Sequence, residues 1–211
     1  MGICDLHCHL LPEIDDGSVS RENFERMLQL YRESGVGSIA FTPHVYNPYV
    51  TTNISMLRGT YEWAASIASS MGLVTYLGSE LFVGTQKVLK SVPIKNTYSL
   101  VEFGINLPPA NLFERLEALA GTGLTVIVAH IERYRWLSVE SPLLARFKDL
   151  GALVQVNVEA VESGLALPYL HAGLVDIIAT DNHGEESLPG RLLSVLGNWP
   201  EVYQKMERMG L

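Results

Sequence analysis

The chain has 211 residues, of which 47% are hydrophobic, enough to bury the core of one domain, predicted to span residues 1–211. A net charge of −8 argues against binding to a phosphate backbone, so no nucleic-acid partner is expected. No apolar stretch approaches the roughly 20 residues of a membrane span, and the N-terminus lacks a basic, signal-like segment. The sequence therefore predicts a cytoplasmic protein without a membrane span.

Short apolar runs recur along the whole chain and predict seven strands, at residues 3–7, 38–42, 74–79, 99–103, 125–129, 153–157 and 175–180. Segments with helical periodicity lie between them, such as Phe24, Met27, Leu28 and Tyr31 ahead of Gly35, a usual helix stop. Repeated strand–helix units indicate parallel strands joined by helices, in a barrel or in an open doubly wound sheet.

The first predicted strand carries Asp5, His7 and His9 at alternate positions, so these side chains share a face and two imidazoles can reach one ion. Taken alone, a His-x-His pair is a weak signal. Cys4 and Cys8 share the opposite face roughly 13 Å apart at strand spacing, which is too far for a disulfide. We expect both cysteines to be reduced, buried thiols.

Polar residues stand at the carboxyl end of every predicted strand, in chain order His7 and His9, His44, Glu80, Glu102, His130, Gln155 with Asn157, and Asp181 with His183. In parallel barrels the active site forms at this face from several strands, whereas an open sheet concentrates its site at one switch point. No Gly-rich phosphate-binding motif occurs. This distribution favours a barrel with a radial site.

Five of the six histidines fall at predicted strand ends, which supports a shared metal site. Taken singly, His44 after Thr-Pro could cap a turn, and His130 could be a hydrogen-bonded residue that only ends its strand. The sixth, His171, lies within a helical pattern and is expected to be a surface or core residue without a metal role.

Carboxylates complete the candidate ligand set. Glu80 and Glu102 each end an apolar run, where an unpaired charge is costly to bury and a cation relieves the cost. Asp15 and Asp16 fit ligands, turn formers or a helix cap equally well. Imidazole and carboxylate ligands suit Mn, Fe or Zn. The candidate ligands here are more numerous than one tetrahedral site uses, so more than one ion is expected. Two neighbouring ions can generate a hydroxide nucleophile and clamp a phosphoryl group, so hydrolysis is the expected chemistry.

Two arginines could bind an anionic substrate at this face. Arg133 lies on the loop that leaves the fifth predicted strand, and Arg191 follows the seventh. The guanidinium group presents a planar fork that matches phosphate oxygens. Arg191 could equally be a solvated helix residue, whereas Arg133 is better placed. Tyr46, Tyr49 and Tyr134 could line the rim, although loop tyrosines more often serve packing.

These motifs together resemble the polymerase-and-histidinol-phosphatase (PHP) superfamily, and within it the bacterial manganese-dependent tyrosine phosphatases that regulate capsule synthesis. The resemblance covers residue 3 to about 185 and rests on DLHCHLLP, IDDG, TPH, GSE, HIERY, QVN and TDNH. It implies an α/β fold, a distorted seven-stranded (β/α)7 TIM-like barrel with a trinuclear metal site. It also implies removal of phosphate from the tyrosine-rich tail of a kinase that controls exopolysaccharide synthesis.

The resemblance further implies nine metal ligands and a phosphate-binding arginine. One ion would be held by His7, His9, Glu102 and Asp181, with Glu102 bridging to a second ion held by His44 and His130. A third would be held by Asp16, Glu80 and His183. Two to three ions per chain are therefore expected, with Mn²⁺ the first choice and Fe or Zn the alternatives. Arg133 would bind phosphoryl oxygens, with Arg191 as a candidate second clamp.

Two residues depart from the family's usual pattern: Ile131 replaces a proline and Asn182 replaces a small residue, and neither change removes a ligand. The alternatives are a histidinol-phosphate or other small-molecule phosphatase of the same superfamily, an amidohydrolase or TatD-like nuclease, and a catalytically silent metal-binding regulatory module. The amidohydrolase and TatD families expect a histidine on the sixth strand, where this chain has Asn157. The complete ligand set argues against a silent module.

Overall fold

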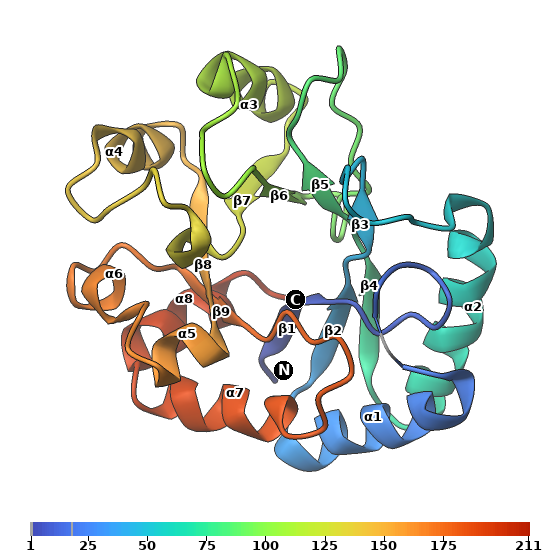
Figure 1. Cartoon of the computed structure of the whole chain (residues 1–211). Helices are drawn as coiled ribbons and strands as arrows, with labels where there is room; N and C mark the ends of the chain where they lie inside the picture. The colour runs from blue at the N-terminus through green and yellow to red at the C-terminus, as the bar shows by residue number, and fades with distance from the viewer. Residues whose placement is uncertain (1, 18) are drawn as a thin grey trace.

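The computed structural model describes residues 2–17 and 19–211, so Met1 and Ser18 of the predicted domain 1–211 lie outside the described residues. Figure 1 shows the helices arranged around the outside of the strands. In the described part the strands are β1 (Cys4–Cys8), β2 (Ser38–Phe41), β3 (His44–Val45), β4 (Val74–Leu77), β5 (Glu80–Phe82), β6 (Tyr98–Glu102), β7 (Thr125–Val128), β8 (Leu153–Asn157) and β9 (Ile177–Ala179).

Helices lie between most of the predicted strands, but none is formed between β4 and β6 in the described residues, where the sequence pattern predicts one. The helices are α1 (Arg21–Ser34), α2 (Ile54–Ser70), α3 (Leu112–Ala120), α4 (Pro142–Asp149), α5 (Val158–Glu162), α6 (Leu167–His171), α7 (Leu188–Gly197) and α8 (Pro200–Arg208), with a 3₁₀ turn at Ile131–Arg133. None of these helices is both long and apolar enough to cross a bilayer. The buried apolar side chains form one core between the helices and the strands.

All named strands pair in parallel, in a three-stranded sheet of order β1-β2-β4 and a six-stranded sheet of order β3-β5-β6-β7-β8-β9. The mixed α/β class with parallel strands is therefore confirmed. The predicted number of seven strands is wrong, because nine are present in the described residues.

The difference arises because a further short strand, β3 or β5, follows each of the predicted strands 38–42 and 74–79. Pro43 has no N–H to donate to a ladder, and it separates β2 from β3. Gly78 and Ser79 separate β4 from β5, where the backbone packs so closely that a Cβ on Gly78 would lie 2.5 Å from Ile94 Cγ1. Both further strands belong to the six-stranded sheet, and each begins with a candidate ligand, His44 or Glu80, which the sequence analysis placed at the end of the preceding strand.

Helix α1 lies where its periodicity predicts it. Ser20 Oγ accepts a hydrogen bond from Asn23 N at 3.3 Å, and Gly35 ends the helix with a φ of 89°. Its buried face consists of Phe24, Met27, Leu28 and Tyr31. The Tyr31 hydroxyl donates to Asp5 Oδ2 at 2.7 Å, which links the helix to β1.

The chain segments that follow β1 and β9 lie side by side. Cys8 and Asn182 form an isolated parallel bridge. His9 N donates to the Asn182 carbonyl, and Asp181 N donates to the His7 carbonyl, both at 2.8 Å. These contacts bring together the His-x-His and Asp-x-His motifs from opposite ends of the chain.

Candidate metal centre

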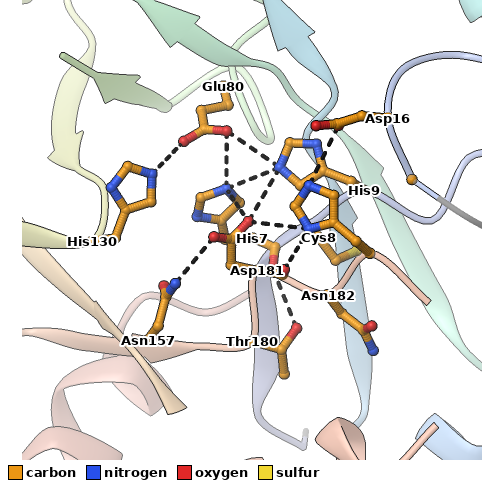
Figure 2. A network of polar contacts seen from close by, with 12 residues as sticks. His7, Cys8, His9, Asp16, Glu80, His130, Asn157, Thr180, Asp181 and Asn182 are labelled. Atoms are coloured by element: carbon orange, nitrogen blue, oxygen red, sulfur yellow. Dashed lines mark hydrogen bonds and ion pairs between the residues drawn. The ribbon is translucent and has the colours of Figure 1, made fainter. Parts of the chain in front are cut away.

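Glu80 belongs to the polar cluster drawn in Figure 2 and is 1% exposed. Its Oε2 lies 3.3 Å from His7 Nε2, 3.2 Å from His9 Nε2 and 3.0 Å from His44 Nδ1. Its Oε1 lies 2.7 Å from His130 Nε2. A single carboxylate therefore contacts four imidazoles that come from β1, the residue after it, β3 and the end of β7.

Asp181 is the second carboxylate of the inner cluster. Its Oδ1 lies 3.3 Å from His7 Nε2 and 3.4 Å from His9 Nε2. Asn157 Nδ2 donates to Asp181 Oδ2 at 3.0 Å. Asp181 has a φ of 53° and His130 one of 29°, backbone conformations that non-glycine residues adopt at a cost. The fold therefore holds two candidate ligands in unfavourable backbone conformations.

A third part of the cluster faces solvent. Asp16 Oδ1 lies 3.4 Å from His183 Nε2 and 3.7 Å from His44 Nε2, and the rings of His9 and His183 stack with centroids 4.3 Å apart. The side chains of Asp16 and His183 are 44% and 37% exposed. This outer part therefore lies where a substrate can approach.

Ligand atoms within 4.8 Å of one another form three groups: His7, His9, Glu80 and Asp181; His44, Glu80 and Glu102; and His9, Asp16, His44 and His183. This grouping differs from the one that the resemblance implied, since Glu80 rather than Glu102 lies with His7, His9 and Asp181. The reason is strand register. His44 pairs with Glu80, whereas Glu102 pairs with Phe82, two residues farther along β5.

Three imidazoles use Nδ1 for a protein hydrogen bond and direct Nε2 towards the cluster. The partners are the Gln155 side chain for His7 at 3.2 Å, the Asp15 carboxylate for His9 at 2.7 Å, and the Asp181 carbonyl for His183 at 2.8 Å. Metal-binding histidines are typically oriented in this way, because the Nδ1 bond fixes both the ring and its tautomer.

Among the described residues, His130 Nδ1 is buried without a hydrogen-bond partner, and Glu80 Oε2 is buried against three imidazoles without a hydrogen bond of good geometry. Unpaired buried polar atoms are costly, and a cation would satisfy them. The donor set of imidazole nitrogens and carboxylate oxygens is also one that Mn, Fe and Zn accept. These residues therefore fit divalent metal ions.

The carboxylates of the cluster favour positive charge on or between the neighbouring imidazoles. Burial lowers the pKa of His9, but contacts with Asp15, Asp181 and Glu80 outweigh it and raise that pKa well above its usual range. Burial likewise opposes the shift at His44, where Glu102 and Glu80 raise the pKa to about 10. Such surroundings bind protons or metal ions in competition, because both use the same imidazole lone pairs.

The two predicted arginines have different environments. Arg133 Nη2 lies 2.7 Å from Asp181 Oδ2. Burial lowers the pKa of Arg133, but the charges of Asp181 and Glu132 outweigh burial, so that this pKa is raised. Arg133 lines the cavity above the cluster. Arg191 lies on α7, where its guanidinium binds the Glu162 carboxylate of α5, and it is absent from the cavity lining. The structure does not bring Arg191 to the site.

Several supporting residues were not identified as such from the sequence. Gln155 and Asn157 were noted only as polar strand ends, and their period of two on β8 was the available signal, because it places both on one face. The sequence pattern around Asp15 fits a ligand, a turn former or a helix cap, and the structure makes Asp15 the hydrogen-bond partner of His9. Asn47, which donates to Glu102 Oε1 at 2.7 Å, carried no signal beyond its position three residues after His44.

The cavity above the cluster has a volume of about 440 Å³. Candidate ligands and Arg133 line its inner part, and Phe82, Tyr49 and Ile105 contribute apolar surface. His171 lies outside it, on α6, with its ring against Trp199 at a centroid distance of 5.5 Å. The structure therefore does not bring His171 to the cluster.

The family of capsular polysaccharide synthesis proteins described as CpsB/CapC matches residues 3–203. The tyrosine-protein phosphatase CpsB of Streptococcus pneumoniae is 26% identical over 205 residues, covering 88% of this chain and 84% of that protein. The tyrosine-protein phosphatase YwqE of Bacillus subtilis is 24% identical over 194 residues, covering 85% and 76%.

A solved structure described among those of YwqE from Bacillus subtilis and CpsB from Streptococcus pneumoniae, "unique metal-dependent tyrosine phosphatases", matches with a TM-score of 0.81. It is 22% identical and covers 98% of this chain and 92% of that chain. The likeness extends over the whole fold, including every strand that carries a candidate ligand.

Proposed function

The chain belongs to the CpsB/CapC family of capsular polysaccharide synthesis, and from this premise we propose that it is a metal-dependent phosphatase that hydrolyses phosphotyrosine in proteins. The relatives CpsB and YwqE carry the name tyrosine-protein phosphatase. The observation that carries the proposal is the convergence of histidines and carboxylates on Glu80, beside Arg133 in one cavity.

The proposed ligand sets follow the distances around Glu80. One ion would be held by His7, His9, Glu80 and Asp181, and a second by His44, Glu80 and Glu102, with His130 at 2.7 Å from Glu80 Oε1. A third would be held by Asp16 and His183 beside His9 and His44. Mn²⁺ is the proposed metal, with Fe and Zn as alternatives and two to three ions per chain. When bound, the ions supply the activated water and the positive charge that phosphoryl transfer requires.

The chain's own residues would orient the substrate. Arg133 extends into the cavity from the turn after β7, and its contact with Asp181 holds the guanidinium beside the candidate ligands. A planar fork in that place binds two phosphoryl oxygens at once. The phenol that leaves has a pKa of about 10, so it needs little help from a general acid.

A cysteine nucleophile does not fit this chain. Cys4 and Cys8 are buried, and neither is followed by arginine six positions later, where cysteine-dependent phosphatases place one. Burial raises the pKa of Cys4 to about 12 and that of Cys8 well above its usual range, so both remain thiols at neutral pH. Hydrolysis by activated water is the remaining route.

We further propose a barrel fold, a kinase substrate and a cytoplasmic location for this phosphatase. The strands would form a distorted barrel, which the Cys8–Asn182 bridge between the ends of β1 and β9 supports. The substrate would be the tyrosine-rich tail of a bacterial kinase of exopolysaccharide synthesis, in line with the family's link to capsular polysaccharide. The phosphatase would then act in the cytoplasm.

The test measures metal content by elemental analysis together with turnover of three substrates: a phosphotyrosine peptide, an aryl phosphate and histidinol phosphate. We expect preferential hydrolysis of phosphotyrosine, loss of activity with a chelator and recovery with Mn²⁺. Preference for histidinol phosphate would replace the proposal with a small-molecule phosphatase. Bound metal without any turnover would replace it with a silent regulatory module.

A further inference from the structure

We infer that Tyr49 and Ile105, at the mouth of the cavity, form the subsite for the aromatic ring of a phosphotyrosyl side chain. This inference rests on the proposed function and adds the residues that would distinguish an aryl phosphate from an alkyl phosphate. Both side chains line the same cavity as Arg133 and the candidate ligand His183. Apolar side chains and the proposed phosphate-binding groups therefore line one cavity.

The side chains of Tyr49 and Ile105 are exposed to solvent. Tyr49 is 88% exposed and Ile105 is 50% exposed, although most large apolar side chains of this chain are buried. Scattered exposed apolar residues need no explanation, but these two adjoin the metal centre. Phe82 lines the same cavity and is partly buried, which extends the apolar surface inwards.

The loop that carries Tyr49 is fixed to the metal centre. Asn47 Nδ2 donates to Glu102 Oε1 at 2.7 Å, while Asn47 Oδ1 accepts from Tyr49 N at 2.8 Å. Thr52 Oγ1 donates to the His44 carbonyl at 2.7 Å. Tyr46 has a φ of 61°, an unusual conformation for a bulky residue. The hydrogen bonds of Asn47 therefore tie the backbone at Tyr49 to the candidate ligand Glu102.

The length of the substrate side chain explains why such a surface matters. In phosphotyrosine a benzene ring separates the phosphate from the peptide backbone, whereas in phosphoserine a single carbon does. With phosphate at Arg133, the ring of phosphotyrosine reaches the apolar residues while its backbone stays at the mouth. A phosphoserine peptide would have to bring its backbone into the cavity. Ring contacts with Tyr49 and Ile105 therefore select for aryl phosphates.

The experiment compares Tyr49→Ala, Tyr49→Phe and Ile105→Ala with the native protein, all loaded with Mn²⁺. Two matched peptides carry phosphotyrosine or phosphoserine, and a third carries the non-hydrolysable analogue phosphonomethyl-phenylalanine. Leu165→Ala is the control, because Leu165 is also exposed, at 58%, but does not line the cavity. Metal content is measured for every variant.

We expect the two alanine variants to raise KM for phosphotyrosine, and Kd for the phosphonate peptide, by roughly 3- to 10-fold. Metal content, kcat and the values for phosphoserine should change little, and Tyr49→Phe and Leu165→Ala should behave like the native protein. Unchanged KM and Kd in both alanine variants would overturn the inference, as would equal losses for the two peptides or a Tyr49→Phe variant as weak as Tyr49→Ala.

A native protein that fails to hydrolyse phosphotyrosine would refute the proposed function instead. Binding of the phosphonate peptide is measured without turnover, so it still decides the inference separately. Weaker binding by Tyr49→Ala and Ile105→Ala would then support the aromatic subsite, and equal binding would refute it.

Discussion

Glu80 is the residue on which the metal centre depends most directly, because its two oxygens contact four imidazoles. Burial raises the pKa of Glu80, but His7, His130 and His44 outweigh burial and lower it well below its usual range. The surrounding imidazoles therefore favour the carboxylate form of Glu80. Glu102 contacts His44 and Asn47 and lies nearer the cavity.

We predict that Glu80→Gln lowers bound metal and reduces phosphatase activity on the order of 10³-fold, because the amide removes the charge shared by two ions. Glu102→Gln should lose activity less severely and retain more metal. His171→Ala is the control and should be nearly silent. Elemental analysis and kcat/KM measure both effects. Equal metal content in the Glu80→Gln and native proteins would contradict the bridging role.

Arg133→Ala is expected to reduce kcat/KM for aryl phosphates by roughly 10²- to 10³-fold, the usual loss when one donor to a developing charge is removed. Metal content should remain unchanged, because Arg133 contacts Asp181 Oδ2, whereas Oδ1 is the oxygen nearest His7. Arg133→Lys should restore activity only in part, since it lacks the planar fork. Arg191→Ala serves as the control with near-native kinetics. Loss of metal in Arg133→Ala would show that the residue is structural.

The two cysteines provide a separate test of the nucleophile. Because burial raises the pKa of Cys4 to about 12, we expect neither Cys4 nor Cys8 to react with iodoacetamide in the folded protein at roughly neutral pH. The Cys4→Ala and Cys8→Ala variants should keep activity that a chelator abolishes, provided that they fold. Chelator-resistant activity that disappears in Cys8→Ala would contradict the metal mechanism.

At the scale of elements, the break between β4 and β5 places two consecutive strands in different sheets. β4 belongs to the three-stranded sheet and β5 to the six-stranded sheet. Gly78 N donates to the Phe41 carbonyl, which continues the ladder with β2, and Glu80 two residues later pairs with His44 of β3. Ser79 Oγ accepts a hydrogen bond from Val92 N at 2.8 Å, which fixes the bend. The break therefore directs the side chain of Glu80 towards the histidines of the cluster.

Gly78→Ala should destabilise the protein by about 1–3 kcal/mol, because the new methyl group would lie 2.5 Å from Ile94 Cγ1 in a packed region. Gly59→Ala is the matched control. Gly59 lies inside α2, and a methyl group added there would meet nothing within 4 Å, so alanine should stabilise by about 0.5–1 kcal/mol. Urea unfolding of the metal-free protein measures both. A Gly78→Ala variant as stable as the native protein would contradict the packing argument.

At the scale of the whole molecule, the candidate ligands come from segments at both ends of the chain and from β3, β5, β6 and β7. Metal ions that bind all of these segments are bound by the folded state alone, because the unfolded chain cannot bring the ligands together. Metal binding should therefore contribute to the stability of the entire domain.

Removal of metal with a chelator is expected to lower Tm by roughly 5–10 °C, and Mn²⁺ should restore it. The pH dependence has a defined sign. In the metal-free protein the pKa of His44 is raised to about 10. Protonated His44 therefore contributes fully to the free energy of unfolding below about pH 6.5, and this contribution is lost as pH rises towards 10. Mn²⁺ should therefore raise Tm most at alkaline pH. Calorimetry at about pH 6 and about pH 9 tests this, and a larger metal effect at the lower pH would contradict it.

The sequence by itself determined the parallel strands, most of the helices between them, the periodicity of α1 and the polar residues that follow the apolar strands. These features are local, because alternation along a strand and spacing along a helix fix which side chains share a face. Only the tertiary structure decided that Glu80 rather than Glu102 lies with His7 and His9, that Arg191 binds Glu162 instead of facing the cavity, and that Asp15 orients His9. Each of these depends on the register between strands or the packing between helices that are far apart in the chain, which local patterns do not encode.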